Sequence, residues 1–233
     1  MKLLRRTIRN LILESWYATD MTSIEWMITK LGLSKGKIEI VISENHKTDH
    51  DLVIEVNNIM PNKTKRIGLL LIDRSYADCL DTFEISWAHM PYKTRNLGFG
   101  PLMYEVAMEY ITQKYNVGLT CDRQSVSEFA YPVWEKFLER SKSDPEITTE
   151  LLDFDAGPEE KKFTPGNKSD DCWETTSLKW YREKTKEHGW SDDGPTDEFR
   201  KYYIENDPTS RTYKKSPART IKILKDLGML KIQ

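Results

Sequence analysis

A glycine-rich turn, Arg95-Asn96-Leu97-Gly98-Phe99-Gly100, has the residue types that bind a phosphate group. It separates a strand-like segment, Phe83–His89, from a helical pattern that begins at Pro101. Backbone N–H groups in such a turn point toward a ligand at the positive end of the helix dipole. The two glycines leave room for that ligand beside the backbone, and the arginine can add a charge-assisted hydrogen bond. The turn therefore predicts phosphate binding.

The same turn differs from two familiar phosphate sites. No Lys-Ser or Lys-Thr pair follows the glycines, which excludes a P-loop, and two glycines at this spacing fall short of the dinucleotide fingerprint. A diphosphate that is bound without a required magnesium ion is the ligand class that remains.

Two titratable side chains on the preceding strand are candidates for acid–base chemistry. Glu84 lies on this strand, and burial beside Phe83 and Trp87 is expected to raise its pKa into the range of a general base. The alternative is an exposed carboxylate paired with a neighbouring Lys or Arg. His89, at the end of the strand, has an ordinary pKa suited to an acid or a base, but a histidine there is more often a partly buried structural residue.

Other reactive residues do not form a recognisable site. His46, His50 and Asp51 fall in a polar loop between strands, where i,i+4 spacing does not bring two imidazoles to one face, so no metal site is expected. The three cysteines lie far apart and cannot make a complete disulfide framework. They favour a reducing cytoplasm.

The chain has 233 residues, of which 38% are hydrophobic and 31% are charged, as expected for a globular protein. Its apolar runs, such as Ile67–Ile72, are far shorter than the roughly 18 residues that span a bilayer, which argues against a membrane protein. The first eighteen residues mix Lys and Arg with Leu and Ile, but Glu14 interrupts them, and they predict an amphipathic helix and not a targeting peptide.

The formal net charge of -2 conceals two segments of opposite sign. Residues 144–200 contain 16 acidic and 8 basic residues, whereas residues 201–233 contain 8 basic and 3 acidic ones. A total near zero argues against a dedicated nucleic-acid coat, although the basic tail leaves a local contact open. The tail residues that could touch phosphates are Lys214, Lys215, Arg219, Lys222 and Lys225; a solvated helix face is their more common role.

Hydrophobic periodicity predicts a mixed α/β order of elements. Two helices, about 3–17 and 24–31, precede four strands, and the short polar links between the strands indicate an antiparallel meander. The predicted strands are Lys37–Ser43, Leu52–Val56, Ile67–Ile72 and Phe83–His89. After them come a helix over Pro101–Tyr115, a short strand over Val117–Cys121, and a helix that opens at Ser125 and is kinked by Pro132.

The remaining sequence predicts an extension. Residues 143–206 are polar and irregular, and a last helix, Ala218–Leu227, ends at Gly228 before the short apolar segment Met229–Ile232. We therefore expect one domain over residues 1–142 and an acidic extension with a basic C-terminal helix over residues 143–233.

Residues 37–140 resemble the GNAT superfamily of N-acetyltransferases. The resemblance is carried by Arg95-x-x-Gly98-x-Gly100 after a strand and before a helix, and by Ser127-x-x-Ala130-x-x-x-Trp134 after the next strand. The run 100–137, together with Asp170-Asp171-Cys172, also resembles phage-encoded GNAT-like proteins.

This resemblance implies a mostly antiparallel, splayed sheet flanked by helices, with acetyl-CoA between the two strands that diverge. A substrate amine would attack the thioester directly, with the N–H near Met90 stabilising the oxyanion and Glu84 as the base. His89 and Tyr131 are further catalytic candidates. The residues implied in cofactor binding are His89, Met90, Arg95, Asn96, Leu97, Gly98, Phe99, Gly100, Leu102 and Trp134.

The sequence departs from this family at two positions. Trp134 stands where many members have a tyrosine that protonates the departing thiolate, and an indole is not a practical acid; Tyr131, Cys121 or water would have to replace it. Ser127 replaces the usual asparagine. Two hypotheses follow, an N-acetyltransferase acting on an amine of a protein or a small molecule, and an inactive GNAT-like module for binding or assembly. Either would act in the cytoplasm, or in a virion if the chain is phage-encoded; the oligomeric state stays open.

Overall fold

The computed structural model describes residues 38–44, 50–75, 82–95, 98–122, 126–151, 190–191, 194–195 and 206–233. The two expected N-terminal helices and most of the acidic segment lie outside these residues. Within them, no helix combines the length and the apolar character needed to cross a membrane.

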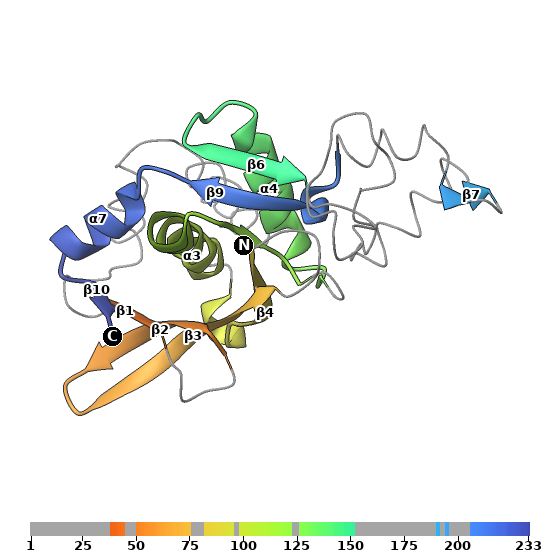
Figure 1. Ribbon diagram of the computed structural model, residues 1–233. Coiled ribbons are helices and arrows are strands. Elements are labelled where there is room, and N and C mark those ends of the chain that lie inside the picture. The colour runs from red at the N-terminus through yellow and green to blue at the C-terminus, as the bar shows by residue number, and fades with distance from the viewer. Residues whose placement is uncertain are drawn as a thin grey trace, which may run out of the picture. The chain divides into compact units, whose positions relative to one another are not determined.

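The strands and helices together give the expected mixed α/β class (Figure 1). The strands are β1 (Ile38–Ser43), β2 (Leu52–Met60), β3 (Lys63–Ser75), β4 (Thr82–His89), β5 (Gly118–Thr120), β6 (Ile147–Leu151), β7 (Trp190–Ser191), β8 (Gly194–Pro195), β9 (Arg211–Lys215) and β10 (Leu230–Ile232). The helices are α3 (Phe99–Tyr115), α4 (Tyr131–Ser141) and α7 (Arg219–Asp226), with two 3-10 helices, η1 (Tyr92–Thr94) and η2 (Pro208–Ser210).

Eight of the described strands form one hydrogen-bonded sheet in the order β10-β1-β2-β3-β4-β5-β9-β6. β1 runs antiparallel to β2, and β2 runs antiparallel to β3, which confirms the expected meander for these strands. Parallel pairing occurs between β4 and β5 and between β1 and β10. β7 and β8 make a separate two-stranded sheet.

The hairpin of β2 and β3 is longer than the sequence pattern indicates. The polar residues 57–66 were expected to form a linker, but they continue both strands to the turn at Pro61 and Asn62, with Met60 opposite Lys63. The apolar pattern in the sequence ends where the strands extend beyond the core. The strands continue there because the backbone hydrogen bonds between them do not require apolar side chains. A register shift between Val56 and Asn57 marks a bulge at that point.

The C-terminal residues belong to the sheet. Arg211–Lys215, which has no apolar periodicity, forms β9 and pairs with β5, while Leu230–Ile232 pairs with β1. The chain folds as two compact units, Met1–Asp73 with Ser86–Lys114 and Lys215–Gln233, and Arg74–Ile85 with Tyr115–Lys214. These units do not follow the expected boundary at residue 142.

Helix α3 is the core helix of the first unit. It begins at Phe99, two residues before the expected start at Pro101. The buried side chains on it are Phe99, Leu102, Met103, Tyr104, Val106, Ala107, Met108, Glu109, Tyr110 and Ile111. Because these residues cover most of its circumference, the helix is enclosed and not merely amphipathic.

Helix α4 begins later than expected. It starts at Tyr131, so Pro132 lies in the first turn, where a missing N–H is tolerated, and does not kink the helix. Before the helix, the Ser127 hydroxyl accepts a hydrogen bond from the Ala130 N–H at 3.2 Å, but the N-cap of α4 is Ala130 and has no side-chain cap, so Ser127 stabilises the preceding turn and does not cap the helix. The expected start at Ser125 is therefore wrong.

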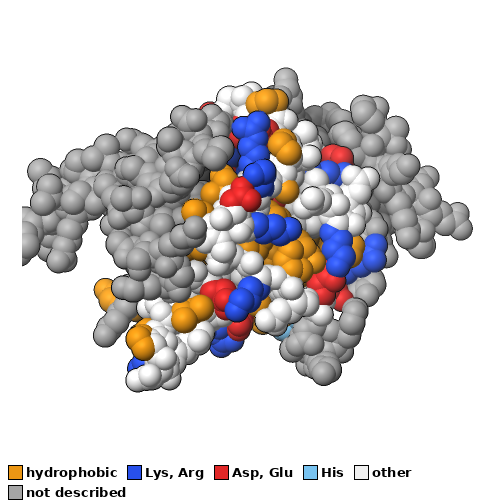
Figure 2. All heavy atoms as spheres, turned by 90° about the vertical axis from the view of Figure 1, so that its left-hand side faces the viewer, with side chains coloured by type: hydrophobic (Ala, Val, Ile, Leu, Met, Phe, Trp, Pro, Cys, Tyr) orange, Lys and Arg blue, Asp and Glu red, His pale blue; other side chains and the backbone are white. Residues whose placement is uncertain are grey.

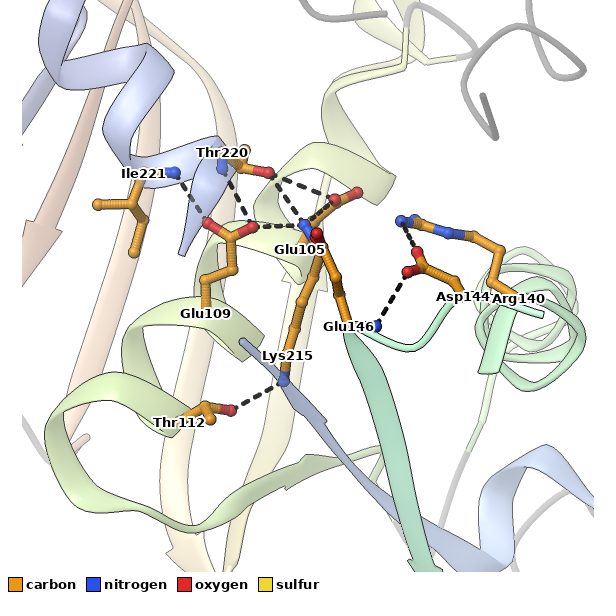
Figure 3. Close-up of polar contacts among 9 residues, drawn as sticks. All are labelled: Glu105, Glu109, Thr112, Arg140, Asp144, Glu146, Lys215, Thr220 and Ile221. Atoms are coloured by element: carbon orange, nitrogen blue, oxygen red, sulfur yellow. Dashed lines mark hydrogen bonds and ion pairs between the residues drawn. The ribbon is translucent and has the colours of Figure 1, made fainter. Parts of the chain in front are cut away.

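A buried ion cluster joins the C-terminal segment to α3 within the first unit (Figure 3). The Lys215 ammonium donates to Glu105 at 2.5 Å and to Glu109, and the Lys215 N–H donates to Thr112 at 3.0 Å. The side chain of Lys215 is 4% exposed and that of Glu109 is 0% exposed. Lys215 lies on β9 and is enclosed, so it is not part of the solvated basic helix face that the sequence indicated.

Glu109 also caps helix α7. Its carboxylate accepts the N–H groups of Thr220 at 3.1 Å and Ile221 at 2.8 Å, both in the first turn of α7. These N–H groups have no acceptor within their own helix, and a negative charge near them is favourable. One carboxylate therefore fixes both Lys215 and the start of α7 onto α3.

The cluster changes the pKa values of its members. Burial lowers the pKa of Lys215, but the carboxylates of Glu105 and Glu109 raise it, and the net pKa lies above the ordinary value. Burial raises the pKa of Glu109, against the opposing attraction of Lys215. Because the folded-state pKa of Lys215 is raised, its stabilising contribution is complete below about pH 10.4 and is lost as the pH rises through the folded-state value.

Gly118 marks a close contact in the second unit. The Thr82 hydroxyl donates to the Gly118 carbonyl at 2.6 Å and lies 2.8 Å from the hydroxyl oxygen of Thr212, which joins β4, β5 and β9. A Cβ atom at Gly118 would lie 2.0 Å from the Thr212 hydroxyl oxygen. Only glycine fits between these strands.

We predict that Gly118→Ala destabilises the protein by about 1–3 kcal/mol, because the added methyl group overpacks a buried site. Denaturant unfolding measures this loss. The double variant with Thr212→Ala should recover part of it, since the clashing hydroxyl is removed; full additivity of the two losses would contradict the assigned contact.

We predict that Lys215→Met lowers the free energy of unfolding by about 3–5 kcal/mol, because it leaves the Glu109 carboxylate buried without its cation. Lys222→Met is the matched control: its exposed pair with Asp226, at 2.6 Å, should be worth less than about 1 kcal/mol. Denaturant titrations at pH 8 compare the two variants. If both variants lost the same free energy of unfolding, burial would add nothing to the contribution of the Lys215 ion pairs.

Candidate functional site

The connection between β4 and α3 is held by hydrogen bonds of η1 within the first unit. The Thr94 N–H donates to the Pro91 carbonyl at 2.8 Å, and the Thr94 hydroxyl lies within hydrogen-bonding distance of the carbonyls of Pro91 at 2.9 Å and Ile67 at 3.1 Å. This turn is therefore fixed to strand β3 before the glycine-rich residues begin.

Arg95 is tied to the end of β4. Its N–H donates to the Pro91 carbonyl at 3.2 Å, and its Nε donates to the Met90 carbonyl at 2.9 Å. The expectation that the Arg95 amide contributes to an anion cradle is therefore wrong, because that amide already has an acceptor. The side chain remains exposed and is directed by its bond to Met90.

Gly98 and Gly100 differ in whether the structure requires a glycine. Gly98 has a φ of 87°, in the left-handed region that side chains disfavour, and its carbonyl accepts the Leu102 N–H at 3.2 Å. Gly100 lies in the first turn of α3, and a Cβ atom built there meets nothing within 4 Å. The fold requires glycine at position 98, but no steric contact requires it at position 100.

The first turn of α3 can receive an anion. Its N–H groups at Phe99 and Gly100 have no acceptor within the helix, and Pro101 has no N–H. They lie at the positive end of a seventeen-residue helix, beside open space at Gly100. Of the predicted anion-binding segment, only Gly98 and the first turn of α3 remain as candidates. Asn96 and Leu97 lie outside the described residues.

Strand β4 carries the candidate base. Phe83 and Ile85 are buried, whereas Glu84 is half-buried, as strand alternation places it on the opposite face. Trp87 shares the face of Phe83 and is 51% exposed. The expected burial of Glu84 beside Phe83 and Trp87 is therefore wrong, although the position of Glu84 on β4 agrees with the expectation.

Ser86 is a functional candidate that the sequence analysis missed. Its hydroxyl oxygen is buried and has no hydrogen-bond partner among the described residues. It shares the strand face of Glu84 by alternation. Buried polar groups are normally paired, so this hydroxyl marks a place where a ligand or water can supply the missing bond. A serine in a strand gives no signal of this kind in the sequence alone.

His89 and Trp87 form an exposed aromatic pair. Their ring centroids lie 5.3 Å apart and the rings are stacked at 17°. Tyr92, on the hydrogen-bonded turn η1, is 87% exposed. His89 is thus a surface residue at the end of β4, not the partly buried structural histidine that was the alternative.

Two of the implied cofactor contacts lie in cores. Leu102 is 1% exposed on α3. Trp134 is 1% exposed on α4, with its ring centroid 6.1 Å from that of Phe137 and 5.2 Å from that of Tyr213. Both side chains are fully packed, so neither provides a surface that a ligand can touch in this structure.

The remaining reactive residues have structural surroundings. The Tyr131 hydroxyl oxygen is buried at the start of α4. The buried Cys121 thiol donates to the Thr209 carbonyl at 3.5 Å. His50 pairs with Asp73 at 3.0 Å, and the described part of the chain contains no cluster of side chains that could hold a metal ion.

The candidate residues fall into the two compact units. Met90, Arg95, Gly98 and Gly100 belong to the first, and Glu84, Tyr131 and Trp134 belong to the second. No protein-family model, curated protein or solved structure matches this chain. A function must therefore be argued from these residues themselves.

Proposed function

We propose that the protein is an N-acyltransferase of GNAT type that uses acetyl-CoA and a primary amine. The observation that carries this proposal is the start of α3, where Gly98 is left-handed, a Cβ atom at Gly100 would meet nothing within 4 Å, and the N–H groups of the first turn have no acceptor within the helix. Such a turn is suited to the diphosphate of a nucleotide cofactor.

The pairing of β4 supports the same proposal. Its registered pairs with β5 run only from Thr82↔Gly118 to Glu84↔Thr120, while β4 itself continues to His89. These three pairs take up the whole of β5, so they make β5 the parallel neighbour of β4, which a GNAT-like sheet requires.

The residues of the first unit that would hold the cofactor are few. The N–H groups of Phe99 and Gly100 would receive the diphosphate, with Arg95 supplying positive charge nearby in the sequence. The backbone of His89 and Met90 would hold the pantetheine arm. When bound, acetyl-CoA supplies an acyl group that is already activated as a thioester.

Glu84 is the proposed base that takes a proton from the acceptor amine, directly or through a water molecule. It lies eleven residues before Arg95, a spacing that resembles that of the base glutamate in the histone-type branch of the superfamily, and its half-buried place on β4 is compatible with this role. Substrates with a positive charge, such as a lysine side chain or a polyamine, are favoured by the acidic composition of residues 144–200. The proposed place of action is the cytoplasm.

One observation favours a second function, that of an inactive binding or assembly module. Trp134 occupies the position of the usual acid and is packed against Phe137 and Tyr213, as a purely structural residue would be. A GNAT-like protein without a proton donor could keep the cofactor turn and lose turnover.

We predict that acetyl-CoA binds to the wild-type chain in a calorimetric titration and that Gly100→Trp abolishes this binding, because the indole would fill the space beside the α3 N–H groups. Gly100→Ala is the stability control. It should raise the free energy of unfolding by about 0.5–1 kcal/mol, since alanine is a better helix residue than glycine. No binding to the wild-type chain at millimolar acetyl-CoA would eliminate the transferase and leave the assembly module.

We predict that Glu84→Gln lowers kcat by about 10²–10⁴-fold while the Kd for acetyl-CoA changes little, since the amide keeps the shape of the side chain and removes its basicity. Thiol release from acetyl-CoA with a panel of amines measures the rate. Glu139→Gln, on the exposed face of α4, should leave the rate unchanged. An unaltered rate in Glu84→Gln would remove this residue from the chemistry but not the cofactor site.

A further inference from the structure

The turn and the β3 side of the β2–β3 hairpin end are exposed and mostly polar, whereas on β2 Asn57 is buried and Asn58, Ile59 and Met60 are half-buried. Every residue from Pro61 to Arg66 is exposed, whereas β3 is buried from Ile67 to Leu70. The change falls next to the bulge between Val56 and Asn57. In Figure 1, the turn of this hairpin points away from the labelled strands β1 and β10, which belong to the same unit.

This hairpin end is basic. Residues 57–66 contain Lys63, Lys65 and Arg66 and no acidic residue. Strand alternation places the two lysines on one face of the ribbon and Arg66 on the other. Arg66 contacts Glu55 at 2.9 Å, and both side chains are partly exposed, so this pair holds the arginine only weakly. Figure 2 views the molecule from the side on which the hairpin turn lies in Figure 1, and on the described part of that face Lys and Arg side chains are interspersed with Asp and Glu.

The exposed stretch of the hairpin end, Pro61–Arg66, buries little apolar surface. Lysine and asparagine are poor strand residues, and a two-stranded ribbon without a core is only marginally stable in water. Met60↔Lys63 and Asn58↔Lys65 nevertheless continue the ladder to the turn. A polar ribbon that is kept in register beyond the core, with positive charge on both faces, fits a polyanionic partner better than a role in packing.

We propose that the tip of the β2–β3 hairpin, residues 57–66, docks into the major groove of duplex DNA. The four exposed residues Lys63–Arg66 span about 10 Å along the strand, at the usual rise of an antiparallel strand, which is enough to reach the floor of a groove about 8.5 Å deep. The major groove is about 12 Å wide and about 8.5 Å deep and admits a two-stranded ribbon. Inserted tip first, the ribbon turns its two faces toward the two phosphate backbones, so that Lys63 and Lys65 meet one and Arg66 meets the other.

The same geometry discriminates between nucleic acids. The major groove of A-form RNA is deep and narrow and does not admit such an element. A two-stranded ribbon therefore favours B-form DNA over duplex RNA of the same sequence. The overall charge of -2 makes this a local contact and not a general coating of nucleic acid.

Fluorescence anisotropy of the full chain with a labelled 20-base-pair DNA duplex tests the proposal. We expect Lys63→Gln/Lys65→Gln to weaken binding and to lower the salt slope of log K by about 2, one for each lost phosphate contact. Between 50 and 200 mM salt, the affinity of the wild type should then fall roughly tenfold further than that of the variant.

The matched control is Lys222→Gln/Lys225→Gln, which removes two exposed charges from α7 in the same unit. It should bind the duplex like the wild type, and equal melting temperatures would confirm that both variants fold. The proposal is overturned if both variants lose affinity equally, if the RNA duplex or heparin binds as tightly as the DNA, or if the wild type does not bind the duplex at all.

Discussion

The first unit depends on one buried charge. The ammonium of Lys215 is removed from water and is compensated by Glu105 and Glu109 on α3. A charge in such a place is tolerated only while its partners stay in position, because an uncompensated buried ion is very costly. Since Glu109 also caps α7, the end of β9, the start of α7 and the core helix α3 have to be placed together.

This coupling explains why strand β9 was hidden in the sequence, whereas helix α7 was predicted over nearly its observed length. The local patterns were sufficient for β1, β4 and α3, because each has a continuous apolar face or run that is visible within one segment. Strand β9 reads Arg-Thr-Tyr-Lys-Lys, and only its distant partners make it a strand: Tyr213 is covered by Trp134 and Phe137, and Lys215 is neutralised by residues more than a hundred positions away. No window of neighbouring residues contains that information.

The candidate site shows the same division between local and distant information. The glycines at 98 and 100 were identified because turn chemistry is local, and the structure gives Gly98 the positive φ that only glycine adopts easily. The pairing of the Arg95 N–H, the unpaired hydroxyl of Ser86 and the full burial of Trp134 depend on how the chain returns to these residues. The resemblance to a family could assign residue types to positions, but it could not tell which side chains are enclosed.

Stability and function therefore rest on different parts of the described chain. The buried cluster around Lys215 and the contact of Gly118 with Thr212 keep elements in place and offer no surface to a ligand. The open space at Gly100 and the exposed hairpin end are features that packing does not require. Gly100 can change without loss of stability, and the exposed end of the β2–β3 hairpin stays in register without a core around it. Each is best explained by a partner that the isolated chain lacks.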